Sequence, residues 1–299
     1  MESVLIHVGY PKTASTYLQA HLFREEFGFQ QFGTWAEIWA RLIGPNPLWY
    51  SPEAVRETVE PTRRTGAARG LIPVITHELL VGHPVSGGHQ AAWVAQRLAD
   101  LWPEAQILMV IREQRQLLYS LYAQYARGSG PLSLEEYMFP PGGERQPSFD
   151  FRYLEFDRLI RLYQKRFPRV KVLCFEALRA NPLAFCREIL DLQGLPQVDS
   201  LPSGAVNAAP RAPTIAFRSY ANRWLLRGET NHVAPFSIPA VGRILDRLDH
   251  WWPERLAIRL RRRLEEQIEE AVGERFAASN QRTAKLIDVD LRGLGYQVA

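Results

Sequence analysis

Four short apolar runs alternate along the chain with segments of helical period. The apolar runs are Val4 to Val8, Leu71 to Thr76, Ile107 to Ile111 and Val170 to Phe175. Each is almost uninterrupted in hydrophobicity, which is typical of strands that are covered on both faces. The helical segments are Thr16 to Phe27, Gln90 to Trp102, Gln114 to Tyr125 and Pro182 to Gln193.

This alternation predicts an α/β fold with a doubly wound, mostly parallel sheet and helices on both of its faces. We expect one domain over residues 1–299, with irregular loops at about 138–151 and 196–240, where turn residues and proline are frequent. In such sheets, ligands bind beyond the carboxyl ends of the strands. The residues that follow each apolar run are therefore the candidates for chemistry.

The first run leads into the stretch GYPKTASTYLQ, residues 9–19. A helix that begins near Ser15 or Thr16 offers unpaired N–H groups and the positive end of its dipole. Lys12 adds a full charge, and Thr13 adds a further hydroxyl, so the turn suits a phosphate or sulfate group. An ordinary helix N-cap uses the same residue types and is the alternative. The turn differs from the GxxxxGK[ST] loop of ATP-binding proteins, because its lysine comes early and no second glycine precedes it.

The third run ends at Arg112, in the stretch QILMVIREQRQLLYS. Ser120 lies eight residues further on, two turns along the helix that follows. Both side chains can face one spot near the end of the strand, where a guanidinium fork and a hydroxyl form a second phosphate site. Two anion sites at two strand ends suggest a ligand that is phosphorylated at both ends.

Composition narrows the class of protein. The 36 basic and 32 acidic residues give a net charge of +4, an excess that fits a small polyanionic ligand and does not indicate nucleic acid. The densest basic run, Arg255 to Arg263, is followed at once by acids at helical spacing and predicts a salt-bridged helix face. Cys174 and Cys186 lack metal-ligand spacing and are expected to be buried free thiols.

The sequence contains no apolar run long enough to span a membrane and no basic segment followed by an apolar stretch at its N-terminus. We therefore expect a soluble, cytoplasmic protein without a transmembrane segment.

The two phosphate-site stretches resemble motifs of one family. YPKTASTYL is similar to the 5′-phosphosulfate loop of sulfotransferases that use 3′-phosphoadenosine 5′-phosphosulfate (PAPS), and IREQRQLLYS is similar to their 3′-phosphate motif. The resemblance continues through VKVLCFEALRANPLAFCREILDLQGLP and through SNQRTAKLIDVDLRGLGY near the C-terminus. Ala14 stands where many relatives have glycine, which argues against a positive φ there unless the alanine is strained.

The resemblance implies a P-loop-like fold and an enzyme that transfers a sulfonate group from PAPS to a hydroxyl or amine acceptor, releasing 3′-phosphoadenosine 5′-phosphate (PAP), without a metal. Lys12 would act on the leaving phosphate, and Arg112 and Ser120 would bind the 3′-phosphate. The nucleotide-binding residues implied for the rest of the site are Thr13, Ala14, Ser15, Thr16, Tyr17, Asn207 and Arg211.

The base that takes the acceptor proton is expected at PVITHELL, where His77 and Glu78 follow the second run. Relatives carry either a glutamate or a histidine in this place. Neighbouring strand residues point to opposite faces, so at most one of the two reaches the acceptor, and Glu78 is the favoured one. The alternative for Glu78 is a cap of the next segment or an ion pair with an arginine, and the alternative for His77 is a satisfied interior histidine.

Two other functions remain open at this point. A small-molecule kinase shares the strand–loop–helix phosphate site, although the GK[ST] motif is missing, and a catalytically inactive nucleotide-binding protein could keep the same residues. The acceptor is expected to be a small molecule, a glycan or a lipid head group. The aromatic residues between the first helix and the second run suit all three: they are Trp35, Trp39, Trp49 and Tyr50.

Overall fold

Five strands form a single sheet in the computed structural model, which describes residues 4–141, 147–202, 210–228, 230–231 and 234–299. The strands are β1 (Leu5–Gly9), β2 (Phe29–Gln31), β3 (Ile72–Thr76), β4 (Gln106–Ile111) and β5 (Arg169–Cys174). Their order is β2-β3-β1-β4-β5, and every neighbouring pair is parallel. The predicted α/β fold with a parallel sheet is thus confirmed.

The strand order places the turns that follow β1 and β4 next to each other, at the carboxyl ends of the strands. The central strand β1 pairs with β3 on one side and with β4 on the other, with Leu5 opposite Val74 and Gly9 opposite Val110. The chain therefore builds β2 and β3 on one side of β1 and then crosses to build β4 and β5 on the other. Ligands of doubly wound sheets bind at such a switch point, outside the carboxyl ends of the strands.

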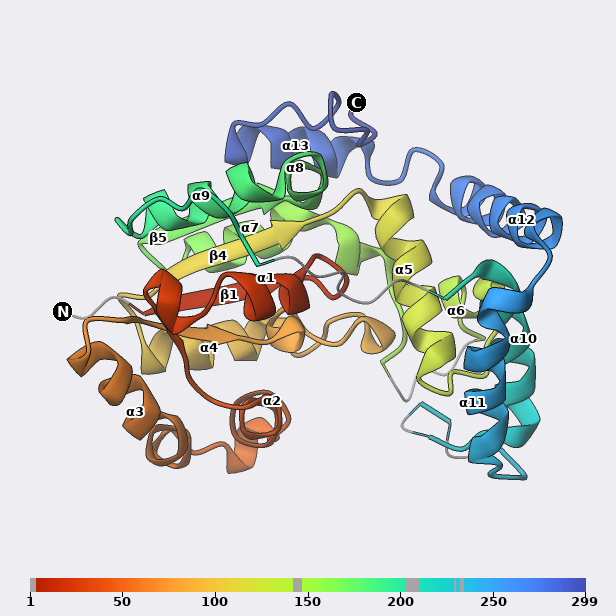
Figure 1. The fold of residues 1–299 in the computed structure, drawn as a ribbon, viewed down its shortest axis with the longest axis horizontal. Helices are drawn as coiled ribbons and strands as arrows, with labels where there is room; N and C mark the ends of the chain where they lie inside the picture. The colour runs from red at the N-terminus through yellow and green to blue at the C-terminus, as the bar shows by residue number, and fades with distance from the viewer. Residues whose placement is uncertain (1–3, 142–146, 203–209, 229, 232–233) are drawn as a thin grey trace.

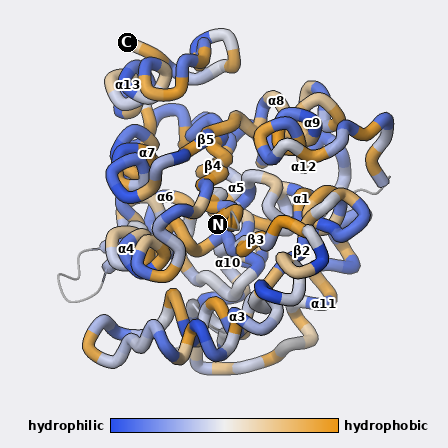
Figure 2. The backbone as a smooth tube through the Cα atoms, turned by 90° about the vertical axis from the view of Figure 1, so that its left-hand side faces the viewer, coloured by the Kyte–Doolittle hydropathy of each residue, from blue (hydrophilic) through white to orange (hydrophobic). Residues whose placement is uncertain are grey.

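Helices cover both faces of the sheet. They are α1 (Ser15–His21), α2 (Trp35–Ile38), α3 (Pro52–Ala68), α4 (Ala91–Leu101), α5 (Gln114–Arg127), α6 (Leu134–Met138), α7 (Phe156–Gln164), α8 (Phe175–Ala180), α9 (Pro182–Leu192), α10 (Ala212–Leu225), α11 (Pro239–Leu248), α12 (Glu254–Val272) and α13 (Ala277–Ile287). Figure 2 shows the strands between α4 and α7 on one side and α1, α8 and α9 on the other. Alternate residues of β1 enter the two layers, with Leu5 packing in the α1–α9 layer and Ile6 and Val8 packing in the α4–α7 layer.

The four predicted strands match β1, β3, β4 and β5 to within about one residue at each end. Three of the predicted helices match α4, α5 and α9. The first predicted helix, Thr16 to Phe27, is wrong in its second half: α1 ends at His21, and a short 3-10 turn follows at Glu25–Phe27. The chain reverses there to enter β2, and Gly28 makes this possible with a φ of 86°.

Part of the region expected to be irregular is helical. The segment at about 196–240 contains the 14-residue helix α10 and reaches the start of α11. The aromatic and arginine content of α10 conceals its helical period, which explains the error. Together with α12, these helices lie at the end of the molecule beyond α5 (Figure 1). Among the described residues, no helix has both the length and the apolar character needed to cross a membrane.

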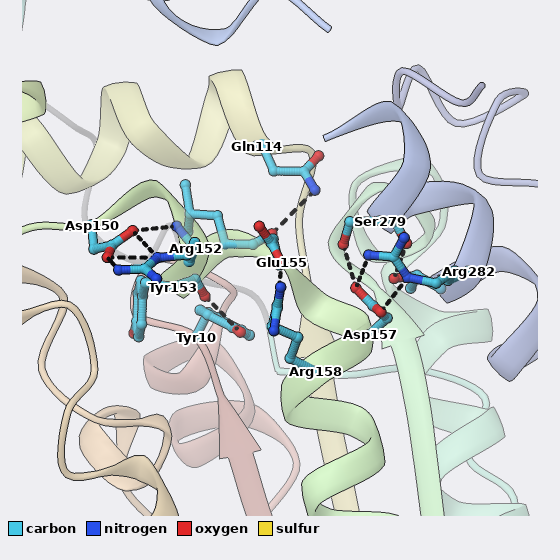
Figure 3. A network of polar contacts seen from close by, with 12 residues as sticks. Tyr10, Gln114, Asp150, Arg152, Tyr153, Glu155, Asp157, Arg158, Ser279 and Arg282 are labelled. Atoms are coloured by element: carbon cyan, nitrogen blue, oxygen red, sulfur yellow. Dashed lines mark hydrogen bonds and ion pairs between the residues drawn. The ribbon is translucent and has the colours of Figure 1, made fainter. Parts of the chain in front are cut away.

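The C-terminal helix α13 docks beside the start of α5 through buried polar contacts. Gln114 Nε2 donates to Asn280 Oδ1 at 2.6 Å, and Asn280 Nδ2 donates back to Gln114 Oε1 at 3.1 Å. Asp157 of α7 accepts from the Ser279 hydroxyl at 2.5 Å and from Arg282 Nε at 2.6 Å (Figure 3). Because α5 begins two residues after Arg112, this docking supports the turn that carries the second candidate phosphate site.

We expect Asn280→Ala to lower the free energy of unfolding by about 2 kcal/mol, because it leaves the buried Gln114 amide without its reciprocal partner. Lys285→Ala, on an exposed position of the same helix, is the matched control and should change that free energy by less than about 0.5 kcal/mol. Urea unfolding followed by circular dichroism measures both. Equal effects of the two substitutions would contradict the structural role of the amide pair.

Candidate functional site

The turn between β1 and α1 holds two non-glycine residues in the left-handed region. Lys12 has a φ of 67° and Ala14 a φ of 72°, so alanine is strained at a position that does require positive φ. Ala14 is the N-cap of α1 and provides no side-chain cap for the helix. The first N–H groups of α1 are thus left for another partner. Backbone strain of this kind concentrates at ligand-binding turns.

Ala14→Gly should leave the free energy of unfolding unchanged or raise it by up to about 1 kcal/mol. The reason is that removing Cβ relieves a left-handed strain of about 1–2 kcal/mol, while glycine adds a smaller entropic cost in the unfolded chain. Ala20→Gly, at an exposed position within α1, is the matched control and should lower the same quantity by about 1 kcal/mol. Thermal unfolding by calorimetry compares them, and a loss at residue 14 as large as that at residue 20 would argue against the left-handed turn.

The hydroxyls of the turn are not equivalent. Thr13 is fully buried and donates its hydroxyl proton to Tyr10 O at 2.5 Å, so this side chain fixes the turn and has no proton left for an anion. Ser15 is also buried, but its hydroxyl has no hydrogen-bond partner among the described residues. Thr16 is exposed, and Tyr17 packs its ring on His21 with 4.7 Å between centroids. Ser15 is therefore the hydroxyl that is both enclosed and available.

Beneath the turn lies a polar group that the sequence analysis overlooked. His7, fully buried in β1, forms a 2.8 Å hydrogen bond between its Nδ1 and Thr76 Oγ1, while its Nε2 has no partner among the described residues. Burial lowers the pKa of His7 to about 4, so the ring is neutral at pH 7. The sequence did contain a signal for this group, because His7 is a polar residue within an otherwise apolar strand, shortly before the turn.

Gly9 sits in close packing that leaves little room for a side chain. A Cβ at that position would lie 3.0 Å from Thr13 Oγ1, 3.1 Å from His7 Nε2 and 3.2 Å from Ser15 Oγ. The two unpartnered polar atoms, His7 Nε2 and Ser15 Oγ, thus approach the same point of the backbone. The base of the turn is shaped for polar contacts that the protein does not itself complete.

Arg112 and Ser120, predicted to face one spot, are in contact. Arg112 Nη1 donates to Ser120 Oγ at 3.0 Å, and Ser120 in turn donates to Gln116 O at 3.0 Å. The guanidinium lies over the Phe175 ring, 4.6 Å from its centroid, and its Nε has no partner among the described residues. The fork is therefore held in place with donor capacity to spare.

The two candidate phosphate turns adjoin each other. Arg112 Nη1 also donates to Lys12 O at 3.1 Å, which joins the end of β4 to the turn after β1. Burial lowers the pKa of Lys12, as do the positive charges of Arg127 and Arg112, while Glu78 acts in the opposite direction. Burial likewise lowers the pKa of Arg112. This edge of the sheet thus concentrates cationic groups that an anion would stabilise.

A cavity of about 620 Å³ opens beside Arg112 and Ser120. It is lined by four arginines from separate elements and by an aromatic ring: Arg112, Arg115, Arg179, Arg261 and Tyr119. Arg179 comes from α8, directly after β5, a position that the strand-end rule could have identified. Arg261 belongs to the basic run on α12, where the i,i+4 pairs Arg261–Glu265 and Arg262–Glu266 match the salt-bridged face predicted there.

Glu113 and Glu176 have structural roles at this cavity. Glu176 Oε1 accepts from Glu113 N at 3.0 Å, and Glu176 Oε2 accepts from the Tyr296 hydroxyl at 3.0 Å. Glu113 caps α5 by accepting from the backbone N–H groups of Arg115 and Gln116. These contacts fix the strand-to-helix turn that carries Arg112.

Glu78 and His77 take different roles. Glu78 is half-buried at the end of β3, and burial raises its pKa, while the charge of Lys12 and a hydrogen bond with Gln124 oppose that shift. His77 is buried and caps the following 3-10 turn, since its Nδ1 accepts from Leu79 N at 3.0 Å. Its lone pair is thereby engaged, and burial lowers its pKa to about 4. Glu78 thus places a titratable carboxylate where it interacts with Lys12, whereas His77 fixes the 3-10 turn that follows β3.

Of the two late residues expected at the nucleotide, the structure describes only Arg211. Asn207 lies outside the described residues. Arg211 is engaged at the N-terminus of α10, where it donates to Trp252 O at 3.1 Å and pairs with Glu254. Among the described residues, no group of three or more histidine, cysteine, aspartate or glutamate side chains could hold a metal ion. Cys174 and Cys186 are buried free thiols, as predicted.

The solved structures similar to this chain include three sulfotransferases. A sulfotransferase from Alicyclobacillus acidocaldarius has 16% sequence identity over 99% of both chains, with a TM-score of 0.59. The sulfotransferase domain from the curacin biosynthetic pathway has 12% identity over 67% of this chain and 76% of the domain, with a TM-score of 0.37. Mouse sulfotransferase SULT7A1, complexed with PAP, has 14% identity over 74% of this chain and 65% of its own, with a TM-score of 0.33.

No protein-family model and no curated protein sequence matches the chain. At an identity of 16%, the first similarity establishes the fold and leaves activity to be argued from the site. The chain therefore has a sulfotransferase-type α/β fold, with its sheet, turns and C-terminal helix within the matched length.

Proposed function

We propose that the protein transfers a sulfonate group from PAPS to a hydroxyl or amine acceptor and releases PAP. The observation that supports the proposal is the contact of Arg112 with both Ser120 and Lys12 O, which brings the two candidate phosphate turns together. A nucleotide with a phosphate at each end matches two adjoining cationic sites. The unpartnered Ser15 hydroxyl and Arg112 Nε are donors that such a ligand would satisfy.

Lys12 would act on the leaving group. As the bond between sulfur and the bridging oxygen breaks, negative charge develops on the 5′-phosphate of PAP. A partly buried ammonium at this turn stabilises that charge more in the transition state than in the ground state. The N–H groups at the start of α1 and the hydroxyls of Ser15 and Thr16 would hold the remaining oxygens.

Glu78 would act as the general base. The acceptor hydroxyl gives its proton to the Glu78 carboxylate while its oxygen forms the new bond to sulfur, and the bond from sulfur to the phosphate oxygen breaks. The burial that raises the pKa of Glu78 also makes it a better proton acceptor than an exposed glutamate. The charge of Lys12 opposes that rise and so favours the ionised carboxylate that a base requires.

The acceptor would bind near Trp35, which stacks on the His77 ring with 5.0 Å between centroids and remains 54% exposed. The Trp35 ring also stacks on Trp39, with 6.2 Å between centroids. The exposed part of this indole, beside the proposed base, suits a sugar ring, an aromatic alcohol or a lipid head group. We retain these acceptor classes, and we place the reaction in the cytoplasm.

The direct test is incubation of the purified protein with PAPS and a fractionated acceptor extract, followed by mass spectrometry. We expect a product that has gained one sulfonate group, formed together with PAP and without added magnesium. Phosphorylated product that appears only with ATP and magnesium would support a kinase instead. Binding of PAP without any sulfated product, across all acceptor fractions, would support a binding protein without turnover.

A further inference from the structure

The outer side of α11 and the first half of α12 carries exposed apolar side chains that the proposed function does not use. Ile244 and Leu248 project from α11, Trp251 follows on the 3-10 turn Asp249–Trp251, and Ile258 projects from α12. Trp251 is 83% exposed. Large apolar side chains that gather on one surface mark an interaction site more often than a free surface.

Contacts on the opposite side fix which way this surface faces. Arg218 of α10 donates to Gly242 O at 2.8 Å and pairs with Asp246, so that side of α11 is turned toward the body of the protein. Trp252 donates to Thr214 Oγ1 at 2.9 Å, whereas its neighbour Trp251 projects outward. The corner between α11 and α12 is thus anchored to α10, and the apolar side chains point away from it.

Arginines surround these apolar side chains at helical spacing. On α11 they are Arg243 and Arg247, and on α12 they are Arg255, Arg259 and Arg263. All five are exposed, and none has a carboxylate partner in the part of the chain that the structure describes. We call these five arginines and the four apolar residues the α11–α12 face.

Charge is unevenly distributed over the chain. The five arginines of the α11–α12 face carry five positive charges without a carboxylate partner in the described part of the chain, whereas the whole chain has a net charge of +4. The arginines of α12 also line a groove of about 700 Å³, with Ile258 and Leu260 among its apolar lining. A partner for this surface must therefore be anionic and must also accept apolar side chains.

We propose that the α11–α12 face binds the surface of an anionic phospholipid bilayer. Arginine guanidinium groups pair with lipid phosphates, while tryptophan and aliphatic side chains enter the boundary between head groups and acyl chains. A second copy of the chain would set arginines against arginines. The phosphate backbone of a nucleic acid would leave Ile244, Leu248 and Ile258 in water. The proposal stands apart from the transfer reaction, because none of these residues lines the cavity at Arg112.

Co-sedimentation of the full chain with vesicles tests this proposal. We expect binding to vesicles of equimolar phosphatidylcholine and phosphatidylglycerol, weaker binding in high salt, and no binding to phosphatidylcholine alone. The double variant Arg243→Gln/Arg247→Gln should bind anionic vesicles about 30-fold less tightly, at about 1 kcal/mol for each arginine. Arg56→Gln/Arg64→Gln, on exposed positions of α3, removes the same charge elsewhere and should bind as the unchanged protein does.

Trp251→Ser separates apolar insertion from charge and should weaken vesicle binding while leaving the melting temperature and PAP binding unchanged. Failure of the unchanged protein to bind anionic vesicles would overturn the proposal. An equal loss of vesicle affinity in the two double-arginine variants would also overturn it, because net charge alone would then explain the binding. A solution dimer that Trp251→Ser dissociates, without vesicle binding, would instead assign the face to a second copy, and a stronger affinity for duplex DNA than for vesicles would assign it to nucleic acid.

Discussion

Lys12→Ala is expected to lower kcat for sulfonate transfer by about 10³-fold, the cost of removing one preorganised charge from a developing oxyanion. PAP binding should weaken much less, because Arg112, Ser120 and the helix N-terminus still hold the nucleotide. Alanine can occupy the left-handed position at residue 12 about as well as lysine, so the turn itself should persist. Steady-state kinetics and PAP titration of the same preparation measure the two effects.

The charge-retaining variant Lys12→Arg is the matched control. It keeps a cation at the turn but spreads it over a planar fork, and should recover part of the lost turnover. Lys12→Ala should also move the acidic limb of the pH profile to higher pH, because Lys12 lowers the pKa of Glu78. A variant that loses PAP binding while its remaining kcat is unchanged would contradict the role given to this lysine.

Glu78→Gln is expected to lower kcat/KM by about 10²- to 10⁴-fold, the usual contribution of a positioned general base. The base acts in its ionised form, so activity of the unchanged enzyme should fall as the pH drops through the pKa of Glu78. Burial raises that pKa, and the fall should therefore occur above the range of an exposed glutamate.

The pH profile distinguishes a base from a structural carboxylate. In Glu78→Gln the residual activity should lose this acidic limb, since the group that titrates is gone. Glu26→Gln, at a half-exposed side chain paired with Arg24, removes a carboxylate elsewhere and should leave both rate and profile unchanged. If Glu78→Gln retained the limb, another group would have to be the base.

The sequence predicted the sheet well because four strands are continuous apolar runs that are covered on both faces. It missed β2, which has only three residues. It also missed α10, whose aromatic side chains are exposed while polar residues such as Arg218 and Asn222 are buried. Helix α3 was missed because its exposed charged residues and an internal proline, Pro61, weaken the periodic signal. These elements depend on tertiary packing more than on local pattern.

The candidate site was predictable where its residues are close in sequence. The contact between Arg112 and Ser120 follows from helix geometry, and the Lys12 turn from its position behind a strand. Arg179 and Arg261 could not be assigned, because α8 and α12 meet at the cavity only in three dimensions. Arg211 does not line this cavity, and carboxylates that come much later in the chain, including Glu254, engage it at α10.

The sequence pattern also could not predict which hydroxyl of the turn is available to a ligand. Thr13 and Ser15 look equivalent in sequence, yet one donates to Tyr10 O and the other has no partner among the described residues. Each of these two hydroxyl residues follows a left-handed residue, Lys12 or Ala14. No residue propensity predicts a left-handed lysine or alanine.

The central claim is that Arg112 and Ser120 bind the 3′-phosphate of the nucleotide. Calorimetric titration with PAP (adenosine 3′,5′-bisphosphate) and with adenosine 5′-monophosphate tests it most directly. The unchanged protein should bind the bisphosphate about 10- to 100-fold more tightly, the value of charged hydrogen bonds to the 3′-phosphate. Arg112→Ala should abolish this preference and Ser120→Ala should reduce it, whereas Lys12→Ala should preserve it. Equal affinity of the unchanged protein for the two nucleotides, or an undiminished preference in Arg112→Ala, would contradict the account.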